Sequence, residues 1–164
     1  MKSIVRSIFI LVFFISSFTV SAQNSKYKCM LQMSNYMGEG AYIVVSLINP
    51  QGKYEKTLYV LGDDKKWYKS LKEWYAFYSK KPSDISAKTG ASVTGGDRCS
   101  TTLEIEDSKI NVGYKLRFET TVEDQKYYAN DIEINLNTEQ LSSKTEGKNY
   151  IKYVRLIKVY ELYI

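Results

Sequence analysis

The sequence contains no histidine, and its 164 residues include only two cysteines and two prolines. Without an imidazole, Ser-His-Asp and Cys-His catalytic arrangements are excluded, as is every zinc site that uses histidine ligands. The acidic clusters at 63–64, 104–107 and 119–124 lack the alternating Asp spacing of a calcium loop, and we interpret them as solvated turns. We therefore expect a protein that is not an enzyme and that holds no metal.

Long apolar runs are also scarce. Residues 8–15, IFILVFFI, form a run that falls short of the roughly 20 residues needed to cross a membrane. The run follows Lys2 and Arg6 and precedes Val20-Ser21-Ala22, an arrangement typical of a secretory signal with its cleavage site. We interpret residues 1–22 as a signal peptide and residues 23–164 as a single domain, located in the periplasm or outside the cell, with no membrane span after signal removal.

Cys29 and Cys99 are the only cysteines of this exported chain. Thiols of exported proteins are commonly paired. We expect a Cys29–Cys99 disulfide that closes a loop of about 70 residues, and two buried free thiols are the alternative.

A strong charge imbalance is missing as well. Removing residues 1–22 leaves 21 basic against 18 acidic residues, a net charge of +3. Lysines alternate with acidic residues through most of the chain, which does not favour a nucleic-acid-binding face. We expect no nucleic-acid partner.

The chain is rich in short segments with β-strand character. Alternating or β-branched runs are bounded by polar or glycine-containing segments, and Asn49-Pro50-Gln51-Gly52 supplies a turn between two of them. The expected strands are residues 27–33, 41–48, 54–61, 99–106, 114–122, 131–136 and 151–164. This number of strands predicts an all-β, immunoglobulin-like antiparallel β-sandwich, with a lipocalin-like barrel as the alternative.

One segment, residues 65–79, has helical rather than strand periodicity. Large apolar side chains recur there at spacings of three and four, and Pro82 follows. The stripe consists of Trp67, Leu71, Trp74, Tyr75 and Tyr78. We expect one inserted amphipathic helix that packs this stripe on the sheet, the alternative being an aromatic platform for a ligand.

The segment SAKTGASVTGG combines glycines with hydroxyl side chains. Within it, residues 89–94 form the string TGASVT, which contains Thr89, Gly90, Ala91, Ser92 and Thr94. This string resembles the recognition sequence of the FAD:protein FMN transferases, which implies that Thr94 would receive FMN through a phosphoester. The alternative is a turn that the fold requires.

Four motifs in order resemble one family. AYIVVSLINPQGKYEKTLYVL is an apolar strand with a glycine turn and a returning strand, and Lys66-Trp67 is followed by an LKEW helix starting at Leu71. The SAKTGASVTGG segment and a GYKLRFE strand starting at Gly113 complete the series. Over roughly residues 41–136 the chain resembles the predicted periplasmic proteins called domain of unknown function 2271.

This resemblance implies an immunoglobulin-like sandwich in the periplasm. Relatives look like neighbours of membrane-anchored PepSY proteins and FMN transferases, which implies an accessory role beside a membrane-anchored redox protein. We expect an exported, non-enzymatic binding or accessory module of a periplasmic redox or iron-handling system, without a bound cofactor. The alternatives are an electron carrier with FMN on Thr94 and a structural or surface-assembly protein.

Overall fold

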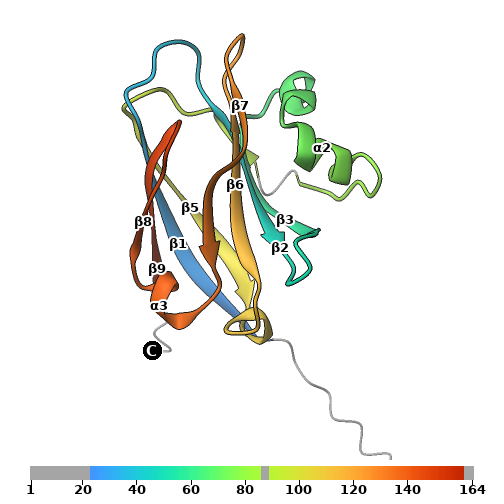
Figure 1. Cartoon of the computed structure of the whole chain (residues 1–164), viewed down its shortest axis with the longest axis vertical. Helices are drawn as coiled ribbons and strands as arrows, with labels where there is room; N and C mark the ends of the chain where they lie inside the picture. Colours follow the sequence, from blue (N-terminus) through green and yellow to red (C-terminus); the bar gives the residue numbers. More distant parts are fainter. Residues whose placement is uncertain (1–22, 86–88, 161–164) are drawn as a thin grey trace, which may run out of the picture.

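Two β-sheets pack face to face in the computed structural model, which describes residues 23–85 and 89–160 (Figure 1). The sheets have the strand orders β5-β1-β9-β8 and β4-β3-β2-β6-β7. The strands are β1 (Asn24–Met33), β2 (Tyr42–Ile48), β3 (Tyr54–Leu61), β4 (Thr89–Gly90), β5 (Arg98–Glu106), β6 (Lys115–Thr121), β7 (Tyr127–Asn135), β8 (Lys144–Glu146) and β9 (Ile151–Val159).

The pairing confirms the predicted antiparallel sandwich. Every strand pair in the two sheets is antiparallel except β3 with β4, which is parallel. Among the described residues no ladder joins one sheet to the other. The lipocalin-like alternative is therefore wrong, because a barrel requires one closed sheet.

The core lies between the sheets and follows from strand alternation. In β1 every second side chain is buried, and Cys29 and Leu31 lie opposite Leu156 and Val154 of β9. The facing sheet contributes Phe118 of β6, which is fully buried, with its neighbours on β2 and β7. Side chains with a period of two thus build one continuous apolar layer.

The β2–β3 hairpin forms where the sequence predicts it, and β3 has the predicted bounds. The Asn49 side chain accepts hydrogen bonds from the backbone N–H groups of Gln51 and Lys53 at 3.0 and 2.9 Å. Gly52 has a φ of +76°, a conformation that favours glycine. The turn residues therefore fix the register of this hairpin.

The predicted single helix over residues 65–79 is instead two short helices. A 3-10 helix, η1 (Lys65–Ser70), is followed at Leu71 by α2 (Lys72–Tyr78). Tyr68 of η1, Leu71 at the junction and Trp74 of α2 recur at intervals of three, and these three side chains are buried against β2 and β3. Trp67, expected in the buried stripe, is only half-buried.

The remaining differences concern short elements and the chain ends. The sequence did not predict β4, β8, η3 (Asp107–Lys109) or α3 (Thr138–Leu141), and β7 begins four residues before the predicted strand. The last strand ends at Val159, and residues 161–164 of the predicted strand lie outside the described residues. The predicted signal peptide, residues 1–22, also lies outside them.

Candidate functional site

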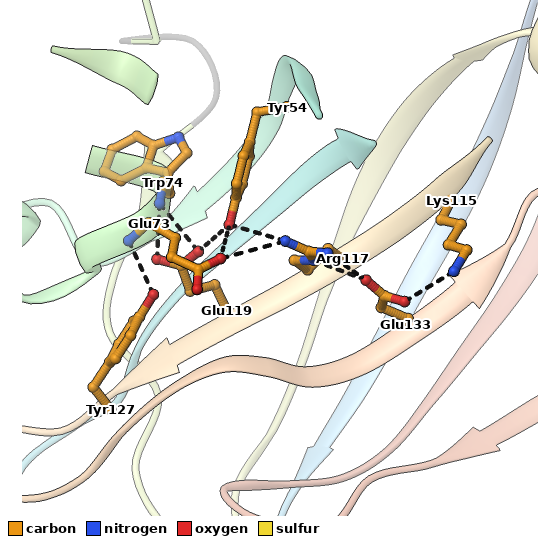
Figure 2. A network of polar contacts seen from close by, with 8 residues as sticks. All are labelled: Tyr54, Glu73, Trp74, Lys115, Arg117, Glu119, Tyr127 and Glu133. Atoms are coloured by element: carbon orange, nitrogen blue, oxygen red, sulfur yellow. Dashed lines mark hydrogen bonds and ion pairs between the residues drawn. The ribbon is translucent and has the colours of Figure 1, made fainter. Parts of the chain in front are cut away.

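A network of charged and hydroxyl side chains covers the outer face of the five-stranded sheet beneath α2 (Figure 2). At its centre is Glu119 of β6, whose side chain is fully buried. The Tyr54 hydroxyl donates to Glu119 Oε2 at 2.7 Å, and the Trp74 backbone N–H donates to Oε1 and Oε2 at 3.1 and 3.2 Å. Charge-assisted hydrogen bonds of this kind compensate a buried carboxylate for its lost hydration.

The network also holds the start of α2. Leu71, the residue before the helix, has a side chain that makes no capping hydrogen bond to the free N–H groups of the first turn of α2. Glu119 accepts from Trp74 instead, and the Tyr127 hydroxyl on β7 accepts from the Glu73 N–H at 3.0 Å. Two strands therefore supply the capping that local sequence usually provides.

Alternating charges extend the network along β6 and β7. The Arg117 Nε donates to Glu133 Oε1 at 2.8 Å, and Lys115 Nζ lies 3.2 Å from Glu133 Oε2. On its other side, Arg117 Nη1 lies 3.5 Å from Glu73 Oε2. Arg117 thus connects the sheet with the first turn of α2.

Burial raises the pKa of Glu119, whereas hydrogen bonds from Tyr54 and Trp74 oppose that rise. Burial also raises the pKa of Tyr127 and of Tyr54. A carboxyl with a raised pKa can serve as a general acid or base only where a substrate reaches it. Because Glu119 is 0% exposed, we assign it the role of anchoring α2.

Two adjoining hollows lie beside this anchored segment and share Trp67, Ser70, Thr121 and Glu123; we call them together the Trp67 cleft. The smaller hollow, of about 150 Å³, reaches Tyr42 and Ser92. The larger one, of about 480 Å³, is lined by η1, the start of α2 and residues 121–127. The cleft combines aromatic rings, hydroxyl groups and charges of both signs, a composition found in small-molecule and peptide sites.

Tyr127 joins the cleft to the polar network. Its side chain lines the larger hollow, while its hydroxyl holds the Glu73 N–H. The Lys72 ammonium lies 5.7 Å from the centre of the same ring. The buried anchor of α2 therefore also positions one wall of the Trp67 cleft.

The structure separates the residues of the predicted FMN acceptor string. Thr89 and Gly90 form β4 and pair with Val60 and Leu61. Ser92 is exposed and lines the smaller hollow, where a Cβ on Gly40 would lie 2.5 Å from the Ser92 hydroxyl. Gly40 therefore permits the close approach that brings this string to Trp67.

Thr94 has a different environment from Ser92. Val93 between them is buried and forms a bridge with Ala41, and Ala91 is exposed. Thr94 is exposed at the start of a turn in which its carbonyl accepts from Asp97 N–H at 3.2 Å. The hydroxyl of Thr94 is thus presented on the surface rather than in the cleft.

The predicted disulfide is not confirmed, because Cys29 and Cys99 are both free thiols. They lie on the paired strands β1 and β5, but Cys29 is opposite Thr101 and Cys99 is opposite Leu31. The cysteines are therefore diagonal neighbours rather than a directly opposed pair. Burial raises the pKa of Cys99 to about 11 and raises that of Cys29 further.

Sequence reasoning missed the centre of the polar network. It grouped Glu119 with solvated turns, whereas Glu119 lies within β6 and is fully buried. No local signal marked Glu119, since Lys115 and Arg117 alternate with apolar residues in the same strand and make Glu119 look like a third solvated charge. Tyr54 and Tyr127 carry no signal either, because their partners are distant in sequence.

Two further properties concern the described residues. They contain no group of three or more carboxylate or cysteine side chains that could hold a metal ion. None of their helices has the length and apolar character needed to cross a membrane.

One of the comparisons with known proteins agrees with the expected periplasmic location. No curated protein and no solved structure matches the chain significantly. The model of one family, described as "Predicted periplasmic protein (DUF2271)", matches residues 24–153. This match includes β1, β8 and the start of β9, which the resemblance over residues 41–136 did not cover, and it places the protein in the periplasm. The chain therefore belongs to the family of predicted periplasmic proteins called domain of unknown function 2271.

Proposed function

We propose that the protein is a non-enzymatic binding module of the periplasm and that the Trp67 cleft is its recognition site. One observation carries this proposal. Trp67 of η1 and Ser92 of the TGASVT string are separated in sequence, yet both line the same hollow. Residues 121–127, from a third segment, complete the cleft. Convergence of three segments around a half-buried tryptophan is typical of a recognition site.

The chemistry of the cleft favours binding over catalysis. Its aliphatic hydroxyl groups belong to Ser70, Ser92 and Thr121, and the sequence has no imidazole to activate them. The carboxyl whose pKa is raised by burial, Glu119, is enclosed beneath α2. The aromatic rings of Trp67, Tyr42 and Tyr127 would instead contribute stacking area.

The family resemblance supports a role for this module in a periplasmic redox or iron-handling system. Relatives look like neighbours of membrane-anchored redox proteins and FMN transferases, so the cleft would engage a partner or ligand of a redox or iron-handling system. A planar aromatic redox compound, of which flavin is the natural example, matches the aromatic walls.

Tryptophan fluorescence tests the site with free FMN as the probe. We expect saturable quenching in the mature chain that persists in Trp74→Phe, which retains Trp67, and disappears in Trp67→Phe. The buried Trp74 donates through Nε1 to the Thr57 hydroxyl at 2.9 Å and serves as the internal reference. Unchanged quenching in Trp67→Phe, or none in the unmodified chain, would overturn the cleft as the site. Turnover of redox dyes without an added cofactor would overturn the non-enzymatic assignment.

A second candidate function is an electron carrier with FMN on Thr94. The exposed position of the Thr94 side chain in a turn supports it, because a transferase must reach the hydroxyl. A transferase would join Thr94 Oγ to the FMN phosphorus of FAD, break the pyrophosphate bond, release AMP and remove the hydroxyl proton. The attached flavin would lie on the same string that supplies Ser92 to the Trp67 cleft.

Intact mass tests this candidate directly. The protein is produced with and without an FMN transferase, together with Thr94→Ala and the matched control Ser92→Ala. We expect a transferase-dependent gain of one FMN moiety in the unmodified chain and in Ser92→Ala, and no gain in Thr94→Ala. An unmodified mass in every sample would identify TGASVT as a structural turn.

A further inference from the structure

A second concave site lies at the end of the sandwich away from the Trp67 cleft, where α3 and the end of β9 are found (Figure 1). This groove has a volume of about 670 Å³, within the range of small-molecule sites. Its walls come from β9 and the start of β1, from η3 with the loop that follows, and from α3. We call it the α3 groove; nothing in the proposed function uses it.

Direct hydrogen bonds hold two walls of the α3 groove together. Asn111 has a φ of 62°, and its backbone N–H donates to the Leu136 carbonyl at 2.7 Å. Its side chain accepts from the Thr138 N–H at 3.1 Å and donates to the Thr138 hydroxyl at 3.1 Å. The η3 loop is thus fixed to the first residue of α3, so the groove is formed before any ligand arrives.

Buried apolar side chains and one carboxylate line the α3 groove beside the polar residues of η3's loop and of α3. Tyr27, Leu141 and Leu156 line it and are each at most 5% exposed. Asp107 lines it too, and its Oδ1 atom is buried without a hydrogen-bond partner among the described residues. A buried carboxylate oxygen without a hydrogen-bond donor costs free energy, so a donor on a bound molecule would stabilise this position.

Two cations lie on the same groove. Arg155 and Lys158 of β9 are exposed and line it, and neither forms an ion pair with a described residue. The Lys158 ammonium lies 5.8 Å from the centre of the Tyr160 ring. The groove therefore combines a buried acceptor, an apolar wall and an exposed cationic rim.

We propose that the α3 groove binds a small zwitterionic amphiphile. Its ammonium group would donate to Asp107, its apolar part would contact Tyr27, Leu141 and Leu156, and its carboxylate would lie near Arg155 and Lys158. This chemistry is shared by free amino acids with an aliphatic chain and by short apolar peptides. The proposal does not depend on the Trp67 cleft or on Thr94.

Three probes with the same six-carbon chain test the proposal: 6-aminohexanoate, hexylamine and hexanoate. Binding to the mature chain is followed by amide chemical shifts in two-dimensional NMR. We expect 6-aminohexanoate to shift the amides of Tyr27, Leu141 and Leu156 and to bind several-fold more tightly than either singly charged probe. Equal affinity of the three probes, or shifts confined to the Trp67 cleft, would overturn the proposal.

Variants separate the two charged ends of the probe. Asp107→Asn should lower the affinity for 6-aminohexanoate about ten-fold, the loss expected for one charged hydrogen bond. It should leave the affinity for hexanoate unchanged. Asp63→Asn removes the same charge from an exposed loop outside the groove and should change nothing. Lys158→Ala should lower the affinity for 6-aminohexanoate and for hexanoate but not the affinity for hexylamine.

Two further changes test whether the probes enter the groove itself and whether the chain terminus competes for it. Ser142→Trp places a large side chain in the groove from an exposed position and should abolish binding of all three probes without disturbing the core. A chain that ends at Tyr160 should bind 6-aminohexanoate with unchanged affinity. A marked gain in affinity after this truncation would overturn the proposal, because it would identify the protein's own terminus as the occupant.

Discussion

Glu119 and Trp74 are 45 residues apart in sequence, yet the carboxylate of the first accepts the backbone N–H of the second at 3.1 and 3.2 Å. Trp74 is in the first turn of α2, where N–H groups have no partner within the helix. A residue of the sheet therefore determines where α2 begins. The Tyr127 hydroxyl on β7 accepts the neighbouring N–H of Glu73, and the same side chain lines the Trp67 cleft. The geometry of the cleft is therefore linked to the hydrogen bonds that hold the start of α2.

Replacing Glu119 by alanine should destabilise the protein strongly. The change leaves the buried Trp74 N–H and the Tyr54 hydroxyl without their acceptor, so we expect a loss of about 3 kcal/mol in the free energy of unfolding. Glu119→Gln keeps one acceptor oxygen and should cost less than half as much. Urea unfolding of both variants measures the difference. A loss below about 1 kcal/mol in Glu119→Ala would contradict the anchoring role.

The same residue should make stability depend on pH. Burial raises the pKa of Glu119 above its ordinary value of 4.5, so the folded state binds this proton more tightly than the unfolded state. Protonation therefore favours folding, and the contribution of Glu119 decreases as the pH rises from 4.5 through the raised pKa. The unfolding free energy of the unmodified chain minus that of Glu119→Gln should accordingly fall across this interval.

Subtracting the value for Glu119→Gln cancels the contribution of carboxyl groups whose pKa is lowered in the folded state. Interactions with Arg117 and Lys115 lower the pKa of Glu133, and Lys109 lowers that of Glu55. These two carboxylates lose stabilisation as the pH falls, but both remain in the variant. A difference that stays flat or rises between pH 4 and 8 would refute the raised pKa of Glu119.

Sequence pattern predicted those features whose cause is local. The bounds of β3 and its turn follow from the turn residues Asn49 and Gly52, whose side-chain and backbone preferences act within four residues. Alternation in β1 likewise placed Leu31 and Met33 in the core. Period and turn chemistry were enough to predict an all-β fold, but the choice between a sandwich and a lipocalin-like barrel required the pairing of the strands.

The candidate site depended on contacts that no local pattern encodes. The change from η1 to α2 at Leu71 replaces Trp67 by Tyr68 in the buried stripe, and only packing on β2 and β3 selects it. Glu119 belongs to the site because Tyr54 and Trp74, both distant in sequence, complete its hydrogen bonds. Such a carboxylate looks like any other charged residue until its partners are known.

Tyr127→Phe should loosen the start of α2 without unfolding the protein. The change removes the hydroxyl that accepts the Glu73 N–H but keeps the ring in the Trp67 cleft. We expect a loss of about 1 kcal/mol in stability and faster hydrogen exchange of the Glu73 amide. Tyr114→Phe is the matched control, because its hydroxyl bonds Lys109 and Glu55 away from α2. Equal exchange of Glu73 in both variants would argue against the role of Tyr127.

The two cysteines should resist alkylation in the folded protein. Cys29 is fully buried, and at pH 7.5 a pKa of about 11 leaves roughly three in ten thousand Cys99 thiols ionised. Intact mass after iodoacetamide treatment should show no adduct on the native protein and two adducts after denaturation, with one in denatured Cys99→Ser. A native mass two hydrogens below that of the reduced chain, together with no adduct in denaturant, would instead demonstrate a Cys29–Cys99 disulfide. Because Cys29 lies opposite Thr101 and Cys99 opposite Leu31, that bond would require β1 and β5 to shift relative to each other.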